Sequence, residues 1–265
     1  MKKIIALTLA LIMMASALVT FSSCGKDNTL VCGVTIFENF NEKDENGNWT
    51  GFESEFAMEV GKLIGMEVKF QEIDWAQKYL ELNSGKIDCI WNGFTANSSD
   101  EIDGVKTKRS DLVDFSYTYM RNQQCVVVKK SNLAAYTSES VLEGKTAAVE
   151  GGSAGAAYAK DAKAGKLVEF PAQNSAFLEV KSGKSDFAVV DILLAQNMCG
   201  KGDYADLAIV EAIELPAEYY AVGFKKGSDL TAKVNEAIKT LDENGKLLEL
   251  AKKYGLENSL EVSYN

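Results

Sequence analysis

The sequence predicts an α/β fold with two lobes, each a mixed, mostly parallel sheet flanked by helices, whose facing edges form a cleft. Strand-like and helix-like segments alternate along the chain, which is typical of parallel sheets with crossover helices. In addition, the phrase L-E-x-x-S-G-K-x-D occurs twice, at residues 80–88 and 178–186, 98 residues apart. The repeat predicts two units of similar architecture.

In the first half of the chain, hydrophobic periodicity indicates the elements and glycines mark their ends. Apolar runs and period-two alternation predict strands, and apolar residues three to four apart predict helices. Gly65 and Gly85 each stand where a helix-ending glycine is expected. The expected elements are strands at residues 30–35, 66–70 and 87–91 and helices at residues 53–64 and 75–82.

The same pattern restarts in the second half. A glycine-rich loop, Gly151-Gly152, precedes one helix, and Asn244-Gly245 separates the last two helices. The expected elements are strands at residues 146–149, 167–170 and 186–190 and helices at residues 154–162, 175–181, 231–241 and 246–254.

Each copy of the repeated phrase leads from a helix end into a buried strand. The first strand continues into Asn92-Gly93-Phe94-Thr95, and the second ends at Asp191. Ligands of parallel sheets collect beyond the carboxyl ends of the strands, so these residues are expected at two facing edges that form a cleft. The repeat alone leaves open the alternative of two similar units without a shared site.

Composition and charge exclude several classes of function. The full chain carries a formal charge of −10, and the charge becomes −12 when Lys2 and Lys3 are removed with the leader. An acidic surface disfavours nucleic acid and anionic lipid as partners. The sequence contains no histidine, which removes the commonest general base and transition-metal ligand. No catalytic residues, cofactor or metal are therefore expected.

Residues 1–23 have the form of an export signal, with Lys2 and Lys3 before an apolar run and Ser22-Ser23 at the cleavage site. Cys24 follows at the position that is acylated in bacterial lipoproteins. We expect a lipid anchor at Cys24, a tether at residues 24–29, and an exported protein held at the cell membrane through that lipid alone. The alternative is an uncleaved membrane anchor.

The remaining cysteines fit no zinc-binding spacing. Three of them, Cys32, Cys89 and Cys125, stand in apolar strand-like segments, so buried free thiols are the first interpretation. A disulfide is the alternative in an exported protein, and Cys199 could take part in it.

Six segments, taken in order, resemble one known family. They are GVTIFENF-NEKDENGNWTGFE, DWAQKYLELNSGKIDCIWNGFT, VDFSYTYM, VEGGSAGAAYA, SGKSDFAVVD and YAVGFKKGSDL. Together they are similar to bacterial extracellular solute-binding proteins, family 3, which pass polar amino acids to ABC transporters.

The resemblance implies a periplasmic-binding-protein-like fold of type II that closes on its ligand through two crossing strands. It implies one lobe of residues 30–121 plus 222–265 and a second of residues 122–221. It also implies a monomeric binding protein rather than an enzyme, with a free amino acid and a transporter permease as partners.

The ammonium group of an amino acid needs acceptors in a closed cleft. By resemblance these are the Gly93 carbonyl, the Thr95 hydroxyl and the Asp191 carboxylate. Asp191 is also a candidate on physical grounds alone, because it ends the apolar run of residues 187–190. Its alternative role is to cap the helix that begins at Ile192.

The carboxylate of the ligand needs donors. The amides of Thr95, Ser153 and Ala154 are expected to supply partial positive charge. The family adds an arginine shortly after the threonine, and here residues 96–108 replace a much shorter segment. Arg109 is the expected carboxylate-binding residue, residues 96–108 a surface loop, and a solvated Arg109 the alternative.

Aromatic and polar side chains are expected around the ligand side chain. Phe37 and Trp75 stand at family positions that sandwich it, Glu38 adds negative charge, and Asn92 offers a donor and an acceptor. These residues suggest a polar side chain, either amide or cationic. The aspartate often found near Thr35 in binders of basic amino acids is absent.

Two other functions remain open. The first is a ligand-sensing lipoprotein without a transport role, which would present the same cleft. The second is a dehydratase-like enzyme for a small carboxylic acid, with carboxylates such as Glu38 or Asp191 as acid or base.

Overall fold

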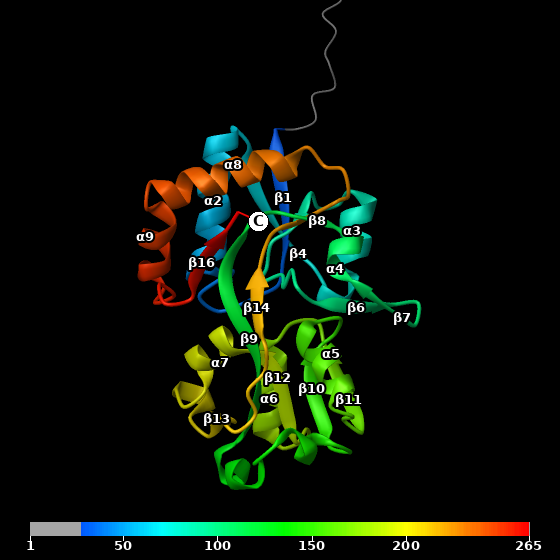
Figure 1. Ribbon diagram of the computed structural model, residues 1–265. Coiled ribbons are helices and arrows are strands. Elements are labelled where there is room, and N and C mark those ends of the chain that lie inside the picture. Colours follow the sequence, from blue (N-terminus) through cyan, green and yellow to red (C-terminus); the bar gives the residue numbers. More distant parts are fainter. Residues whose placement is uncertain (1–27, 265) are drawn as a thin grey trace, which may run out of the picture.

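The computed structural model describes residues 28–264. The predicted export signal and Cys24 lie outside the described residues. The described chain forms two lobes joined by long strands (Figure 1). Within residues 28–264, no helix has both the length and the apolar character needed to cross a membrane.

The first lobe is built on a five-stranded sheet of order β4-β1-β5-β15-β8. β1 (Thr29–Val34) pairs in parallel with β4 (Glu67–Glu72) and β5 (Cys89–Ile90). β15 (Gly223–Phe224) and β8 (Asp114–Phe115) are antiparallel to their neighbours. The sheet is therefore mixed, as predicted.

Helices from both ends of the chain pack on this sheet. α2 (Phe52–Ile64) contacts α8 (Leu230–Glu243) and α9 (Lys246–Lys253). A short 3-10 turn, η1 (Trp75–Gln77), leads into α3 (Lys78–Ser84) near the second lobe.

The second lobe is built on a sheet of order β11-β10-β12-β9-β13. β10 (Thr146–Glu150) pairs in parallel with β11 (Lys166–Phe170) and β12 (Phe187–Asp191). β9 (Thr118–Lys129) is antiparallel both to β12 and to β13 (Leu207–Ile209). The last residues of β10 and β12, Glu150 and Asp191, lie at the edge of the sheet that faces the first lobe.

Three helices pack on the second sheet. α5 (Ala154–Asp161) and α6 (Asn174–Ser182) contact β10 and β12, while α7 (Ile192–Met198) packs on β9. Buried residues of α5 belong to one core cluster of this lobe, whereas those of α6 and α7 belong to another.

Two strands cross between the lobes. The first half of β9 pairs with β14 (Ala217–Tyr220) and with β16 (Leu260–Ser263), and its second half belongs to the second sheet. Figure 1 shows β9 and β14 side by side at the junction. They form the two-stranded connection that the family resemblance implies.

The duplicated phrase forms the same structure twice. Gly85 ends α3 and Gly183 ends α6, both with φ 78° and ψ 16°, a left-handed conformation that glycine adopts without strain. The final aspartate of each phrase accepts a hydrogen bond from an amide of the neighbouring strand: Asp88 from Val31 of β1 at 2.9 Å, and Asp186 from Thr146 of β10 at 2.8 Å. The phrase therefore fixes a helix end and the start of a parallel pair in each lobe.

The prediction that residues 96–108 form a loop is wrong. This segment contains a β-hairpin of β6 (Ser99–Ile102) and β7 (Val105–Lys108) that reaches α5 of the second lobe. Its turn residues, Asp103 and Gly104, have φ of 50° and 79°. An Asp-Gly pair with positive φ is a typical two-residue hairpin turn, a signal that the sequence contained.

The remaining elements are short. They are β2 (Glu42–Lys43), β3 (Trp49–Thr50), α4 (Arg109–Leu112), η2 (Lys130–Ala135), η3 (Glu139–Leu142) and η4 (Gly202–Tyr204).

The four cysteines of the described chain are free thiols. Cys32, Cys89 and Cys125 are buried, as expected, whereas Cys199 is partly exposed. Cys32 and Cys89 are paired across β1 and β5, with their Sγ atoms 3.6 Å apart.

Candidate functional site

The lobes meet across a small cavity at the ends of β5, β10 and β12. Its volume is about 10 Å³, about the least that holds one water molecule. Side chains of both lobes thus nearly fill the cleft. The lining residues are Trp75, Asn92, Gly93, Thr95, Arg109, Gln124, Glu150, Ser153, Ala154, Gln173 and Asp191.

Two carboxylates share their hydrogen-bond donors in this cleft. Gln124 donates from Nε2 to Asp191 Oδ1 at 2.7 Å and to Glu218 Oε2 at 2.9 Å. The Asn122 amide donates to the same two oxygens, and Gln173 donates to the other oxygen of Asp191. Two carboxylates this close repel each other unless a proton or a cation lies between them. The pair can therefore hold a shared proton or a cation.

Loss of solvent around this pair raises the pKa values of both carboxyl groups. Burial raises the pKa of Asp191, and burial together with the charge of Asp191 raises the pKa of Glu218 to about 7. The Thr95 hydroxyl donates to Glu218 Oε2 at 3.2 Å, which links the predicted threonine to the pair. Tyr220 is buried beside them, and burial together with the charge of Asp191 raises the pKa of its hydroxyl.

Asp191 does not act as a helix cap. It is the residue before α7, but its carboxylate makes no capping hydrogen bond to that helix. The amide of Asp191 is instead held by Gln173 Oε1 at 2.8 Å. Its side chain therefore points into the cleft.

Arg109 is buried, with 1% of its surface exposed, rather than solvated. Its Nε and Nη2 donate to Asp100 Oδ1 at 3.0 and 2.9 Å, and its Nη1 donates to the Thr95 carbonyl at 3.2 Å. The guanidinium lies over the Phe94 ring, 4.9 Å from the ring centre. Arg109 thus lines the cavity directly below Thr95.

Lys78 is a second buried cation. Its Nζ donates to the Gly152 carbonyl of the second lobe at 2.7 Å and lies 3.3 Å from Asp100 Oδ2. It also packs on the rings of Trp75 and Tyr79. Burial lowers the pKa of Lys78 to about 8, although Asp100 opposes that shift.

Glu150 ends β10 and faces the first lobe. Its Oε1 accepts a hydrogen bond from the Thr35 hydroxyl at 3.4 Å. Burial and the nearby charge of Asp191 raise the pKa of Glu150 to about 8. A buried carboxylate from the second lobe therefore stands opposite Thr35, where the family's aspartate is absent.

Two predicted residues of the first lobe are held by internal hydrogen bonds. Asn92 Oδ1 accepts from the Thr35 amide at 3.0 Å, and Asn92 Nδ2 donates to the Thr35 hydroxyl at 2.8 Å. The amide of Gly93 donates to the buried carboxylate of Glu53 at 2.9 Å. Gly93 has φ +56°, and an added Cβ would lie 2.9 Å from Phe37, so only glycine fits this turn. Glu53 therefore shapes the turn that leads to Thr95.

The predicted aromatic sandwich is only partly in the cleft. Trp75 lines the cavity, whereas Phe37 is buried and stacks on Phe40 at 4.4 Å. Phe94 packs under Trp75 in a small core cluster, with their rings 5.6 Å apart. Glu38 is half-buried outside the cavity lining, and burial and Glu42 raise its pKa.

The start of α5 also borders the cavity. Ser153 caps this helix by accepting from the Ala156 amide at 3.0 Å, and its own amide donates to the Glu150 carbonyl at 3.2 Å. Ala154 provides the first helical amide. The helix start contributes partial positive charge to the cavity from the second lobe, while Arg109 lines it from the first.

Comparison with known proteins decides the family. The model of "bacterial extracellular solute-binding proteins, family 3" matches residues 30–257. The chain belongs to this family. Its members are solute-binding proteins, so the enzyme alternative has no support from the family.

Individual relatives cover nearly the whole chain. The arginine-binding extracellular protein ArtP of Bacillus subtilis is 26% identical, over 92% of this chain and 96% of its own length. The L-cystine-binding protein TcyA of the same organism is 30% identical, over 88% and 84%. Among solved structures, an ancestral arginine-binding protein bound to glutamine is 32% identical, with a TM-score of 0.76 over 86% of this chain and 97% of that chain.

Several cleft residues of this solute-binding protein were missed from the sequence. Glu150 stands at a strand end as Asp191 does, so the same rule could have found it. Asn122 and Gln124 alternate in β9 and therefore share one face. Glu218 carries no such signal, because its position depends on the pairing of β14 with β9.

Proposed function

We propose that this family-3 protein captures an amino acid with a positively charged side chain and delivers it to the permease of an ABC transporter. The cleft supports this through its charges. Asp191 and Glu150 are buried carboxylates and Glu218 is a partly buried one, whereas the buried cations Lys78 and Arg109 share one carboxylate, Asp100. The surplus of carboxylates is the single observation that carries the proposal.

The two ends of the amino acid find complementary groups. The α-ammonium lies between Asp191 and Glu218, with Thr95 as a further acceptor, since these groups already share donors. The α-carboxylate accepts from Arg109 and from the start of α5, as the sequence predicted. Buried charges need such pairing, because an unpaired charge in a dry cleft is strongly unfavourable.

The side chain of the ligand meets Glu150 and the face of Trp75. Glu150 stands opposite Thr35 with its pKa raised to about 8, so a cationic side chain bound beside it favours its ionised form, and an aromatic face attracts a guanidinium or ammonium group. This refines the sequence prediction of a polar side chain from amide or cationic to cationic. ArtP, named as an arginine-binding protein, is in line with it.

The cellular arrangement follows from the leader. We propose that Cys24 is lipidated and holds a monomeric chain at the outer face of the cell membrane, with the lobes bounded at about residues 121 and 222. A sensor without a transporter would use the same cleft, and family membership favours transport.

A comparison of arginine with citrulline tests the ligand class, because the two differ in a single charge at nearly the same shape. We expect calorimetry on the mature protein to show citrulline binding about 30-fold weaker or worse, the scale for removing one partner of a buried charge pair (roughly 2–5 kcal/mol). Lysine and ornithine complete the cationic panel.

A matched variant assigns the effect to one residue. Glu150→Gln keeps the size of the side chain and removes its charge, so the preference for arginine over citrulline narrows. Equal affinities for arginine and citrulline in the unaltered protein, or no binding of any cationic amino acid, would reject the proposal.

A further inference from the structure

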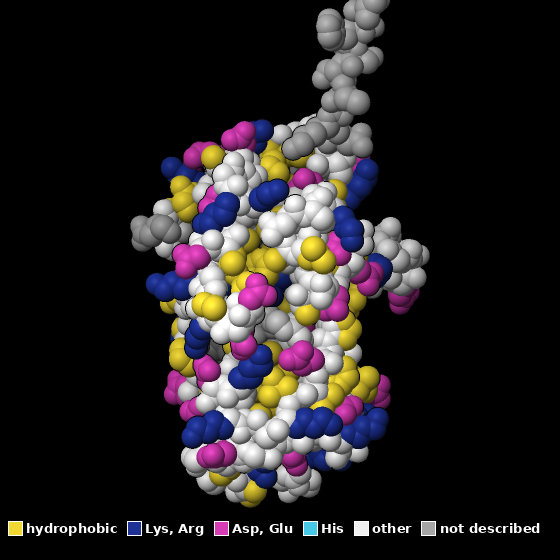
Figure 2. All heavy atoms as spheres, turned by 90° about the vertical axis from the view of Figure 1, so that its right-hand side faces the viewer, with side chains coloured by type: hydrophobic (Ala, Val, Ile, Leu, Met, Phe, Trp, Pro, Cys, Tyr) yellow, Lys and Arg dark blue, Asp and Glu magenta, His cyan; other side chains and the backbone are white. Residues whose placement is uncertain are grey.

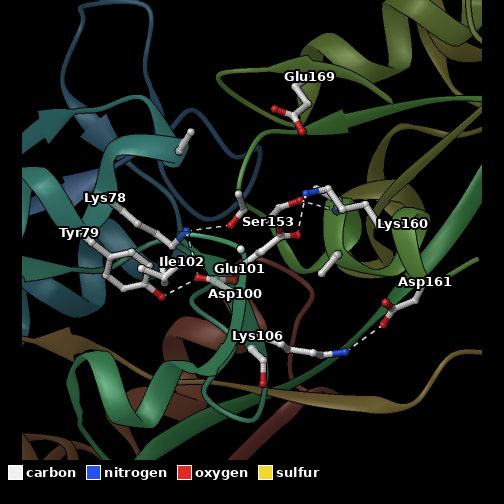
Figure 3. Close-up of a pocket in the computed structure, with 16 residues that line it drawn as sticks. Lys78, Tyr79, Asp100, Glu101, Ile102, Lys106, Ser153, Lys160, Asp161 and Glu169 are labelled. Atoms are coloured by element: carbon white, nitrogen blue, oxygen red, sulfur yellow. Dashed lines mark hydrogen bonds and ion pairs between the residues drawn. The ribbon is translucent and has the colours of Figure 1, made fainter. Parts of the chain in front are cut away.

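The β6–β7 hairpin places one buried carboxylate beside the binding cleft, against the cleft residue Arg109. Asp100 is 7% exposed, although the next residue, Glu101, is exposed. Figure 3 shows Asp100 directed toward Lys78 and Tyr79 at the wall of a cavity of about 370 Å³, which adjoins the amino-acid site through Ser153. The inserted segment therefore contributes to the site rather than only to the surface.

Asp100 holds Arg109 by one edge. Oδ1 accepts from Nε and Nη2 of the guanidinium, and Nη1 is bound to the Thr95 carbonyl. A guanidinium has five N–H donors, so one remains on each of Nη1 and Nη2. Two parallel donors on one edge are the arrangement that binds a carboxylate in a bidentate manner.

Asp100 also faces the second buried cation. Its Oδ2 accepts from the Tyr79 hydroxyl at 2.6 Å and lies 3.3 Å from Lys78 Nζ. Burial alone would raise the pKa of Asp100, but the charges of Arg109 and Lys78 lower it below its usual value. The cluster of Lys78, Arg109 and Asp100 thus carries one net positive charge.

We infer that Asp100 is a specificity-determining residue: it neutralises one of two buried cations and fixes Arg109 with one edge free, so the site accepts amino acids with a single carboxylate and rejects dicarboxylic ones. The inference rests on the proposed function, because it assumes that Arg109 receives the ligand carboxylate. It assigns to the inserted hairpin a part in ligand selection.

Asp100→Asn tests this, since it removes the charge and keeps the shape. Glutamate and glutamine, an isosteric pair, compete against labelled arginine, and their half-displacing concentrations are compared. We expect the glutamate-to-glutamine ratio to shift toward glutamate by about tenfold or more, because a second cation is uncovered. Asp100→Glu restores the original ratio. Glu101→Gln, an exposed neighbour on the same hairpin, leaves it unchanged.

A second variant covers a failure of Asp100→Asn to fold. Lys78→Met removes the other charge of the cluster, so discrimination against glutamate becomes stronger, and Lys78→Met with Asp100→Asn returns the ratio toward that of the unaltered protein. A folded Asp100→Asn variant with the original ratio overturns the inference, as does an unchanged ratio in Lys78→Met.

Arg109→Ala separates this inference from the proposed function. Binding that survives Arg109→Ala contradicts the assigned carboxylate role itself. Loss of about 30-fold or more in Arg109→Ala, together with an unchanged ratio in Asp100→Asn, contradicts only the role of Asp100.

Discussion

At the scale of single residues, the cleft of this protein contains carboxyl groups whose ionised form is unfavourable. Glu150 and Asp191 are buried and Glu218 is partly buried; all three carboxyl groups have raised pKa values, and for each of them loss of solvent is the largest cause. Such groups destabilise the ligand-free fold when ionised and favour a cationic ligand for the same reason. Binding sites commonly give up stability in this way.

The sign of the pH dependence follows from these shifts. A carboxyl group with a raised pKa binds more protons in the folded than in the unfolded chain, so stability falls as pH rises from its usual pKa toward the raised one. For Glu150 and Glu218 this window runs from 4.5 to about 7 or 8.

We therefore expect the melting temperature of the ligand-free protein to decline between about pH 5 and pH 8. Glu150→Gln removes one of these groups, so it flattens the decline and raises the melting temperature at pH 8. Scanning fluorimetry across pH measures both effects, with Glu101→Gln as the exposed control. A decline of the same size in Glu150→Gln would contradict this explanation.

Sequence reasoning found the cleft residues that stand at strand ends or in family motifs, and it missed those fixed by pairing. Asp191 and Thr95 were predicted, and both meet at Glu218 through shared hydrogen bonds. Glu218 itself was missed because the register of β14 on β9 decides its position. Lys78 was missed because its position in a predicted helix does not reveal its contact with the Gly152 carbonyl, which only the fold creates.

At the scale of elements, the repeated phrase is the clearest link between sequence and structure. It produces the same helix end and the same strand start in both lobes. The hairpin at residues 99–108 is the opposite case. Its Asp103-Gly104 turn was visible in the sequence, but the burial of Asp100 depends on partners that come from α3 and α4.

The hairpin touches the second lobe through ion pairs that are exposed. Lys106 lies 3.1 Å from Asp161, and Lys160 lies 3.3 Å from Glu101. Figure 2, a view of this side, shows basic and acidic side chains mixed over the region between the lobes. Exposed ion pairs contribute little to stability, whereas Asp100 is the hairpin residue whose ion pairs are buried.

The glycines of the repeated phrase permit a direct test. Gly85 has open space around its Cα, so Gly85→Ala suffers only the backbone cost of a left-handed residue, roughly 1–2 kcal/mol of the free energy of unfolding. Chemical denaturation measures it, with Ser84→Ala as the control. An unchanged stability would show that the phrase does not need its glycine.

At the scale of the whole molecule, two lobes and a two-stranded connection explain how the site is assembled. Arg109, Thr95 and Lys78 come from the first lobe, Asp191 and Glu150 from the second. In the proposed site neither lobe holds the complete set of groups, because the acceptors for the ammonium group (Asp191, Thr95) and the donors for the carboxylate (Arg109, the start of α5) are each divided between the two lobes. Capture and release therefore require relative motion of the lobes about β9 and β14.

A crystal structure of the mature protein with its tightest-binding cationic amino acid tests the central claim most directly. We expect a ligand enclosed between the lobes, with its α-ammonium on Asp191 and Glu218, its α-carboxylate on Arg109 and its side-chain charge at Glu150. A ligand bound outside the interlobe cleft, or one whose carboxylate makes no contact with Arg109, would contradict it.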